Sequence, residues 1–268
     1  MSLAHVVHKA RRSRAGRGTG GDEQGAEPFR ALARMSAVSG ILFAGLLVAA
    51  LVLVRQAPGI AAPDRVYADF YTVGKGNVLV TAGLYIVPFA GITYLWHMSA
   101  TRTLIESLPG SSSEVPRWLQ LASGVLFVCM LFAGTAAVGA VALLTVFSST
   151  PLPSPEVART LTGAGYGMVF VFGVRAAGMY MITTTTLARR RGLLPRWVAA
   201  VGYLGATFLL LSTTFHPATL LVFPGWVLLL SVVLLVVARR PGAVPTPAAP
   251  VAPTPADPLH RPRPEDLP

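Results

Sequence analysis

Charged positions are almost absent from six long runs of hydrophobic residues along the chain. Stretches such as Ile41–Val54 and Val198–Leu211 contain no charged residue, whereas a helix on the surface of a soluble protein carries a polar stripe. A helix needs about 20 apolar residues to cross a bilayer core. We therefore predict an all-α polytopic membrane protein, a bundle of six transmembrane helices. The predicted spans are Ser36–Val54, Val78–His97, Leu119–Phe147, Leu161–Leu187, Trp197–Phe215 and Ala218–Ala238.

Polar segments flank this predicted membrane domain, which covers residues 36–238. Residues 1–35 are rich in arginine and too long for the charged part of a signal peptide, so they predict a basic disordered tail. Residues 239–268 carry ten of the 22 prolines, which predicts a Pro-rich disordered tail. In the loop Gln56–Gly76 we expect a short helix lying on the membrane surface; a lid that gathers a ligand is the alternative.

The composition agrees with a membrane protein. Hydrophobic residues make up 53% and charged residues 12%, and the mean hydropathy is +0.60. Soluble domains average about 25% charged residues, so these values exclude a disordered chain and argue against a soluble enzyme. The net charge of +11 is of the kind that nucleic-acid-binding proteins carry. However, the basic N-terminal segment lacks the aromatic side chains that stack on bases, so no nucleic acid is expected.

The basic residues lie mainly on one side of the predicted spans. The two tails and the loops after the second and fourth spans hold 17 Lys and Arg, and the other loops hold four. Positive charge marks the cytoplasmic side, so both termini are predicted to be cytoplasmic. The expected partners are membrane lipids, with the arginines on anionic headgroups of the inner leaflet. Whether a protein partner or a homo-oligomer exists stays open.

Arg175 is the one charge within a predicted span, and none of the spans contains an acidic residue to pair with it. A charge in the middle of a membrane helix costs roughly 2.5–3.5 kcal/mol on insertion scales. The polar run Thr183–Thr186 predicts that the inner boundary of the apolar core lies close to Arg175. Three interpretations remain: a structural role by snorkelling or by bonding to carbonyls of neighbouring spans, an anchor for an anionic lipid or substrate, or an oligomer contact.

Two further groups of residues are candidates in the second and fourth spans. Thr81 and Tyr85 lie one helical turn apart and are predicted ligand-binding residues that line an inner cavity facing Arg175; an ordinary polar face in the bundle is the alternative. Gly163 and Gly167, with Gly165 between them, make a small-residue surface that predicts close helix packing.

Catalytic and metal-binding patterns are absent from the sequence. The single cysteine, Cys129, excludes a Cys-based metal site, and no histidine motif for a metal occurs. Ser123 and His216 are predicted at opposite faces of the membrane, which separates the two groups that a serine nucleophile would need. We therefore predict no catalytic residue, no metal and no cofactor.

Short motifs in the last third of the chain point to a family. They are Leu193-Leu194-Pro195-Arg196-Trp197 before the fifth span, Val201-Gly202 within it and Phe223-Pro224-Gly225-Trp226 in the sixth. The chain resembles uncharacterised actinobacterial multi-pass integral membrane proteins that are grouped as a domain of unknown function. This resemblance implies about six helices in a bacterial plasma membrane and carries no established catalytic residues.

A similar helix start occurs twice, as Val115-Pro116-Arg117-Trp118 and as Leu194-Pro195-Arg196-Trp197. Either the second and third spans are duplicated in the fourth and fifth, or both starts converged on Pro, Arg and Trp as a favourable start at the interface.

The function expected from the sequence is non-enzymatic. The chain would bind or sense a lipid or small amphiphile, or act as an accessory membrane subunit. The first alternative is a small-solute transporter or channel with a polar path between the second and fourth spans. The second is a membrane-embedded enzyme.

Overall fold

The fold was analysed in a computed structural model that describes residues 19–72, 77–108, 114–149, 151–212, 216 and 218–239, with side chains from residue 27 onward. All regular structure in these residues is helical. The helices are α2 (Thr19–Val54), α3 (Asp64–Thr72), α4 (Asn77–Thr81), α5 (Val87–Glu106), α6 (Glu114–Phe147), α7 (Pro155–Tyr166), α8 (Val174–Arg190), α9 (Arg196–Leu211) and α10 (Thr219–Arg239), with the π-helical segments η1 (Ala82–Ile86) and η2 (Gly167–Gly173).

Five helices of the described part are long and apolar enough to cross a membrane. They are Glu27–Val54, Asn77–Glu106, Glu114–Phe147, Pro155–Arg190 and Thr219–Arg239. An all-α polytopic protein is thus confirmed, but not six full-length spans. The predicted span Trp197–Phe215 is shorter in the structure because α9 ends at Leu211, where Ser212 adopts an extended backbone with ψ 129°. With 16 residues, α9 extends about 24 Å.

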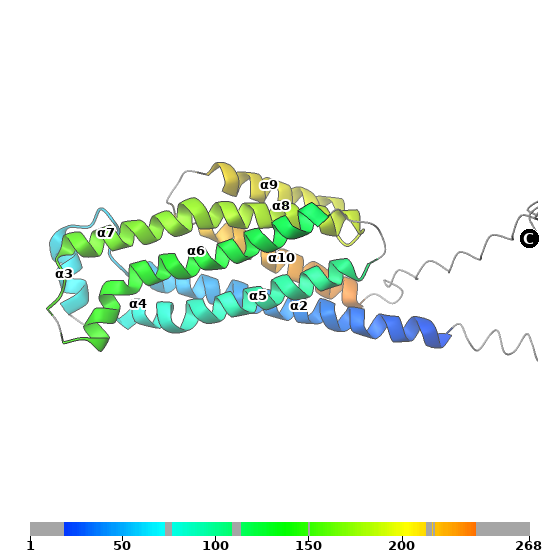
Figure 1. The fold of residues 1–268 in the computed structure, drawn as a ribbon, viewed down its shortest axis with the longest axis horizontal. Helices are drawn as coiled ribbons and strands as arrows, with labels where there is room; N and C mark the ends of the chain where they lie inside the picture. Colours follow the sequence, from blue (N-terminus) through cyan, green and yellow to red (C-terminus); the bar gives the residue numbers. More distant parts are fainter. Residues whose placement is uncertain are drawn as a thin grey trace, which may run out of the picture.

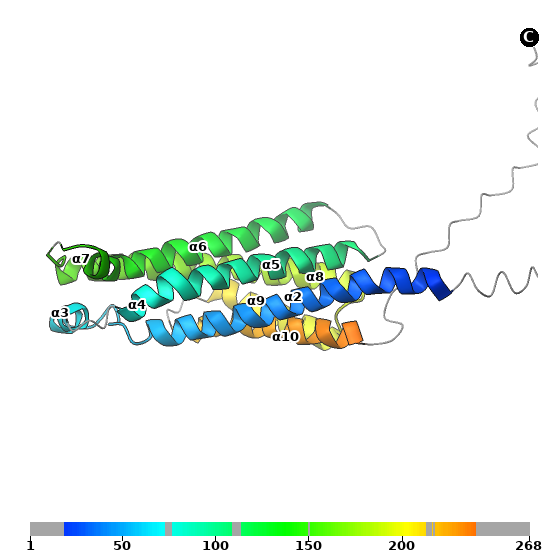
Figure 2. The same ribbon diagram turned by 90° about the horizontal axis from the view of Figure 1, so that it is seen from below.

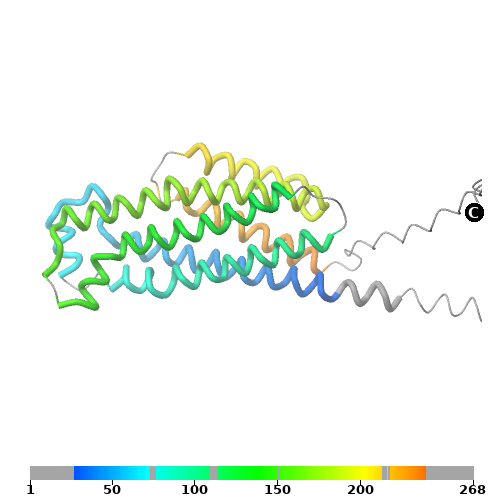
Figure 3. Tube along the Cα trace, viewed as in Figure 1, coloured from blue at the N-terminus to red at the C-terminus, as the bar shows by residue number. Residues whose placement is uncertain are grey.

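The long helices form a ring in chain order (Figures 1 and 2). Each packs against the next one in sequence, from α2 through α5, α6, α8 and α9 to α10, and α10 closes the ring on α2. The chain trace runs up and down the bundle, so that the start of α2 and the end of α10 lie at the same end (Figure 3). Antiparallel neighbours joined by short loops are the usual arrangement in such bundles.

The helix α2 begins earlier than the sequence predicted. The predicted disordered tail covered residues 1–35, but the chain is helical from Thr19. Phe29 and Ala33 are buried in the main apolar core, one helical turn apart, and this packing extends the helix beyond the apolar run. The remaining parts of the two predicted tails, residues 1–18 and 240–268, lie outside the described residues.

The bundle has two parts that differ in their packing. We call the part around α3, α4, η1, α7 and η2 the α3 half, and the part around the described ends of α2 and α10 the tail half. Figure 1 shows that α9 and α10 do not extend along α7. The α3 half is therefore enclosed by fewer helices than the tail half.

The predicted short helix in the loop Gln56–Gly76 is present as α3, which packs against α7. Arg159 of α7 holds it in place, since its Nη2 lies 2.5 Å from a carboxylate oxygen of Asp64 and 2.9 Å from the carbonyl oxygen of Ala62. The Arg159 guanidinium also lies over the Tyr67 ring, 5.3 Å from its centroid. Burial in this packing raises the pKa of Tyr71 to about 12.

Candidate functional site

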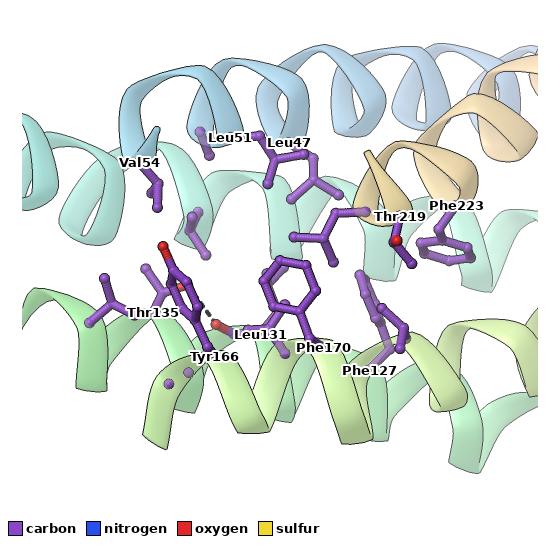
Figure 4. A pocket seen from close by; sticks show the side chains of 18 of the residues that line it. Leu47, Leu51, Val54, Phe127, Leu131, Thr135, Tyr166, Phe170, Thr219 and Phe223 are labelled. Carbon is purple, nitrogen blue, oxygen red and sulfur yellow. Dashed lines mark hydrogen bonds between the residues drawn. The ribbon is translucent and has the colours of Figure 1, made fainter. Parts of the chain in front are cut away.

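An apolar cavity of about 80 Å³ lies in the α3 half, between α2, α6, η2 and α10 (Figure 4). Its lining contains no charged residue. The Thr135 hydroxyl is engaged, because it donates a hydrogen bond of 2.7 Å to the carbonyl oxygen of Leu131 in its own helix. The interior is therefore suited to hydrocarbon. Side chains around it include Leu47, Leu51, Val54, Phe127, Leu131, Thr135, Tyr166, Phe170, Thr219 and Phe223.

Aromatic rings close the cavity toward the tail half. Phe127 of α6 and Phe223 of α10 line it, and their ring centroids are 4.7 Å apart. Both rings also contact Tyr94 of α5, at 5.3 and 5.6 Å between centroids. This layer of edge-on aromatic contacts separates the cavity from the polar packing beyond it.

The helices around the cavity are locally irregular. The π-helical segment η2 contributes Val169 and Phe170 to the lining, and Leu79 and Val87 flank the π-helical segment η1. A π-helical turn inserts an extra residue and widens the helix, and such turns are frequent at functional sites. Two π-helical segments therefore lie beside one cavity. They change which side chains of the second and fourth long helices point into the bundle.

A second hollow lies on the other side of the wall between η1 and α6. This groove measures about 310 Å³ and is lined by Gly83, Leu84, Pro88 and Phe132, among others. Leu84 is 41% exposed and Phe132 37% exposed, so the rim is an apolar outer surface. The cavity and the groove share Leu79, Val87, Thr135 and Gly139.

The structure does not bring Thr81 and Tyr85 to Arg175. Tyr85 is 60% exposed and Thr81 is also exposed, on the outer surface of α4 and η1, and neither lines the cavity. The prediction of an inner cavity between these residues and Arg175 is therefore wrong. Their role as ligand-binding residues stays a prediction.

Arg175 lies in the first turn of α8, next to the last turn of α9. Its guanidinium is half-buried and donates hydrogen bonds to the carbonyl oxygens of Val171, at 2.6 Å, and Ser212, at 3.4 Å. The helix continues 15 residues further to Arg190, about 22 Å, so Arg175 cannot reach that end of the bundle by snorkelling. Bonding to carbonyls, one of the structural alternatives, describes its contacts in the structure.

The carbonyls that Arg175 contacts explain how its charge is compensated. Ser212 follows the C-terminus of α9, where unpaired carbonyls carry a partial negative charge that a cation stabilises. The polar run that suggested a nearby boundary is itself buried, since Thr183, Thr184 and Thr185 pack inside the bundle. No acidic partner of Arg175 occurs among the described ion pairs.

Among the three glycines Gly163, Gly165 and Gly167, only Gly165 packs closely against α6. A Cβ at Gly163 or Gly167 would meet nothing within 4 Å, which corrects the prediction that these two residues form the packing surface. A Cβ at Gly165 would collide with the backbone of Gly134 in α6 and lie 2.6 Å from Val138 Cγ2. The backbones of α6 and α7 are therefore in direct contact here.

A polar cluster that the sequence did not predict lies in the tail half. His97 of α5 is fully buried, and its Nδ1 donates a hydrogen bond of 2.8 Å to the carbonyl oxygen of Ser36 in α2. The hydroxyls of Ser36 and Thr101 are 2.6 Å apart. Gly40 leaves the space for this cluster, since a Cβ there would lie 2.6 Å from His97 Nδ1 and collide with Ser231 of α10. Three helices thus meet at polar side chains.

A second polar contact joins α6 to α8 in the same half. The Gln120 amide donates a hydrogen bond of 2.9 Å to the hydroxyl of Thr184, and both side chains are buried. Hydrogen bonds between membrane helices contribute about 0.6 kcal/mol each on average, so these contacts fix the register of the helices more than they stabilise them. The signal in the sequence was the presence of Ser, Thr, Gln and His at helix positions, but their partners lie more than 60 residues away.

The described residues contain no group of three or more His, Cys, Asp or Glu side chains that could hold a metal ion. No family model, curated protein or solved structure matches the chain.

Proposed function

We propose that this protein binds the hydrocarbon chain of a lipid or a similar amphiphile in the cavity of its α3 half. The observation that carries the proposal is an uncharged apolar cavity, with an exposed apolar groove directly beside it. Helices in lipid associate mainly through van der Waals contacts, and an empty space deprives its lining of these contacts. An occupying chain would restore them.

The properties of the cavity favour a lipid over a polar solute. Channels and transporters line their paths with charged groups, carbonyls or other polar groups that replace the water around the solute. The cavity offers no charge, and its Thr135 hydroxyl is engaged with its own helix. The alternative of a small-solute path between the second and fourth spans therefore has no support from the lining.

The same proposal includes the membrane arrangement. Six crossings, with α9 as a short fifth one, fit a chain whose described ends lie at one end of the bundle. The distribution of Lys and Arg makes that end cytoplasmic in a bacterial plasma membrane. The cavity would then lie toward the outer leaflet.

Filling the cavity tests the binding. A Cβ at Gly139 would meet only the Leu79 carbonyl oxygen, at 4.0 Å, and Gly139 lines both hollows, so Gly139→Leu is expected to fill this space. The matched control is Ala133→Leu, which creates the same side chain, with one carbon fewer added than in Gly139→Leu, at an exposed position of the same helix. Both variants and the parent chain would be purified in native nanodiscs, and the lipids retained after delipidation would be identified by mass spectrometry.

We expect the parent chain and Ala133→Leu to retain the same lipid, and Gly139→Leu to lose it while keeping its thermal stability. Equal retention by all three proteins would contradict binding in the cavity. The absence of any retained lipid from the parent chain would contradict the proposed function as a whole.

A further inference from the structure

Only a thin wall separates the cavity from the groove. Leu79, Val87, Thr135 and Gly139 line both hollows, so each of these residues has the cavity on one side and the groove on the other. Glycine has no side chain with which to close a wall. A shift of the side chains that line both hollows would therefore join them.

The seam in this wall runs between η1 and α6, and small residues meet along it. A Cβ at Gly83 would lie 3.6 Å from Thr135 Cγ2, which is an ordinary contact distance. Across the seam, the wide turn of η1 replaces regular helix, and Pro88 follows it with no backbone N–H to donate. Both features lower the cost of a local opening.

The other side of α6 is closed differently. There the backbones of Gly134 and Gly165 are in contact, and a Cβ at Gly134 would lie 2.8 Å from the Gly165 carbonyl oxygen. A rotamer change cannot separate two backbones. The α2–α5 and α2–α10 contacts are also more extensive than the α5–α6 contact. Among the contacts that α6 makes around the cavity, the one with η1 is therefore weaker than those with α7 and η2.

The two volumes indicate what passes through the seam. A cavity of about 80 Å³ is smaller than an apolar cavity of about 150 Å³ that holds a benzene molecule, so it admits a narrow chain and no bulky ring. The groove of about 310 Å³ holds more of the ligand than the cavity does. Its apolar rim faces the side of the helix where lipid tails lie.

We infer that a single lipid hydrocarbon chain enters the cavity sideways from the bilayer, through the seam between η1 and α6. The chain end occupies the cavity, the middle of the chain lies in the groove, and the headgroup stays outside the bundle. This inference rests on the proposed function and adds its route of access and its class of ligand.

A disulfide across the seam tests the route. In a Cys129→Ser background, Gly83→Cys with Thr135→Cys places two thiols across the seam. A Cβ at Gly83 would lie 3.6 Å from Thr135 Cγ2, which is close to the separation of about 3.5–4.5 Å between Cβ atoms that a disulfide needs. The probe is palmitic acid with a diazirine at the end of its chain. It is added to nanodiscs after oxidation, and cross-links to Tyr166 and Phe170 are mapped by mass spectrometry over time.

The matched control lock is Met130→Cys with Gly173→Cys. A Cβ at Gly173 lies 3.6 Å from the Cβ of Met130, so this bond joins α6 to η2 without touching either hollow. We expect oxidation of the seam lock to abolish labelling of the cavity during the time in which the reduced protein becomes fully labelled. Oxidation of the control lock should leave the rate unchanged. Probe that is loaded before oxidation should stay trapped behind the seam lock.

Equal labelling with the seam locked and reduced would overturn the lateral route but leave binding in the cavity intact. Slowing by both locks would overturn the route as well, because it would show that any cross-link at α6 blocks access. No labelling of the cavity in the reduced protein would contradict the proposed function itself.

Discussion

The two halves of the bundle are built from the same apolar helices, yet they pack in opposite ways. In the tail half, buried polar side chains of different helices meet, as Ser36 meets Thr101 and Gln120 meets Thr184. In the α3 half, helices widened by π-helical turns surround an uncharged cavity. The tail half fixes how the helices are aligned, and the α3 half leaves room between them.

This difference assigns a separate task to each half. Polar contacts between membrane helices specify which faces meet, because a buried donor or acceptor without a partner is costly. Such contacts in the tail half keep the helices in register, and our proposal requires only the α3 half to open. Perturbations of the tail half should therefore lower stability, and perturbations of the cavity should change ligand binding.

The largest expected loss of stability follows the removal of His97. Its ring is fully buried and bonded to the carbonyl oxygen of Ser36, so His97→Ala leaves a cavity and should lower the free energy of unfolding by about 2–4 kcal/mol. The control is Trp96→Ala, the adjacent residue, whose side chain is 59% exposed. Denaturant titration in mixed micelles measures both. A loss of stability no larger than that of Trp96→Ala would show that His97 does not help to hold the helices of the tail half together.

A smaller effect, of opposite sign at two glycines of α2, tests how tightly the polar cluster of the tail half is packed. Gly→Ala inside a helix normally stabilises by roughly 0.5–1 kcal/mol, and Gly45→Ala should do so because a Cβ there meets nothing within 4 Å. Gly40→Ala instead forces a methyl group against Ser231 and His97 and should destabilise by about 1–3 kcal/mol. The same titration reports both values. Stabilisation by Gly40→Ala would mean that the side chains of the polar cluster move aside at little cost.

The hydropathy of the chain predicts the helices, but not how each helix is rotated. The long apolar runs appear as helices, and α3 lies within the loop where a short helix was expected. Thr81 and Tyr85 share a face, as their spacing requires, but that face points outward. The rotation of a helix about its own axis depends on which neighbour it packs against. The π-helical segments η1 and η2 change this rotation again partway along a helix.

The burial of the threonine run and the polar cluster escape prediction for a related reason. Threonines 183–186 resemble a membrane boundary in sequence, but Thr183 donates its hydroxyl to the carbonyl oxygen of Met179, at 2.9 Å, inside the helix packing. His97 resembles a residue at the end of a span, but α2 and α10 enclose it. Both errors treat polarity as exposure to water, whereas the tertiary contacts decide it.

The smallest expected effect concerns Arg175 and separates two of its three interpretations, the structural role and the anionic anchor. Arg175→Gln removes the charge beside the α9 C-terminus, where a cation contributes about 0.3–1 kcal/mol, and should destabilise by that amount. Hydrogen exchange should increase locally in the last turn of α9, where the Ser212 amide bonds to Phe208.

The control Arg34→Gln alters an exposed arginine of α2 and should change stability by less than about 0.5 kcal/mol. If Arg175 compensates helix carbonyls, the lipids retained in nanodiscs stay the same. Selective loss of an anionic lipid, with hydrogen exchange in α9 unchanged, would instead make it a headgroup anchor and move the ligand to the outer surface of α8.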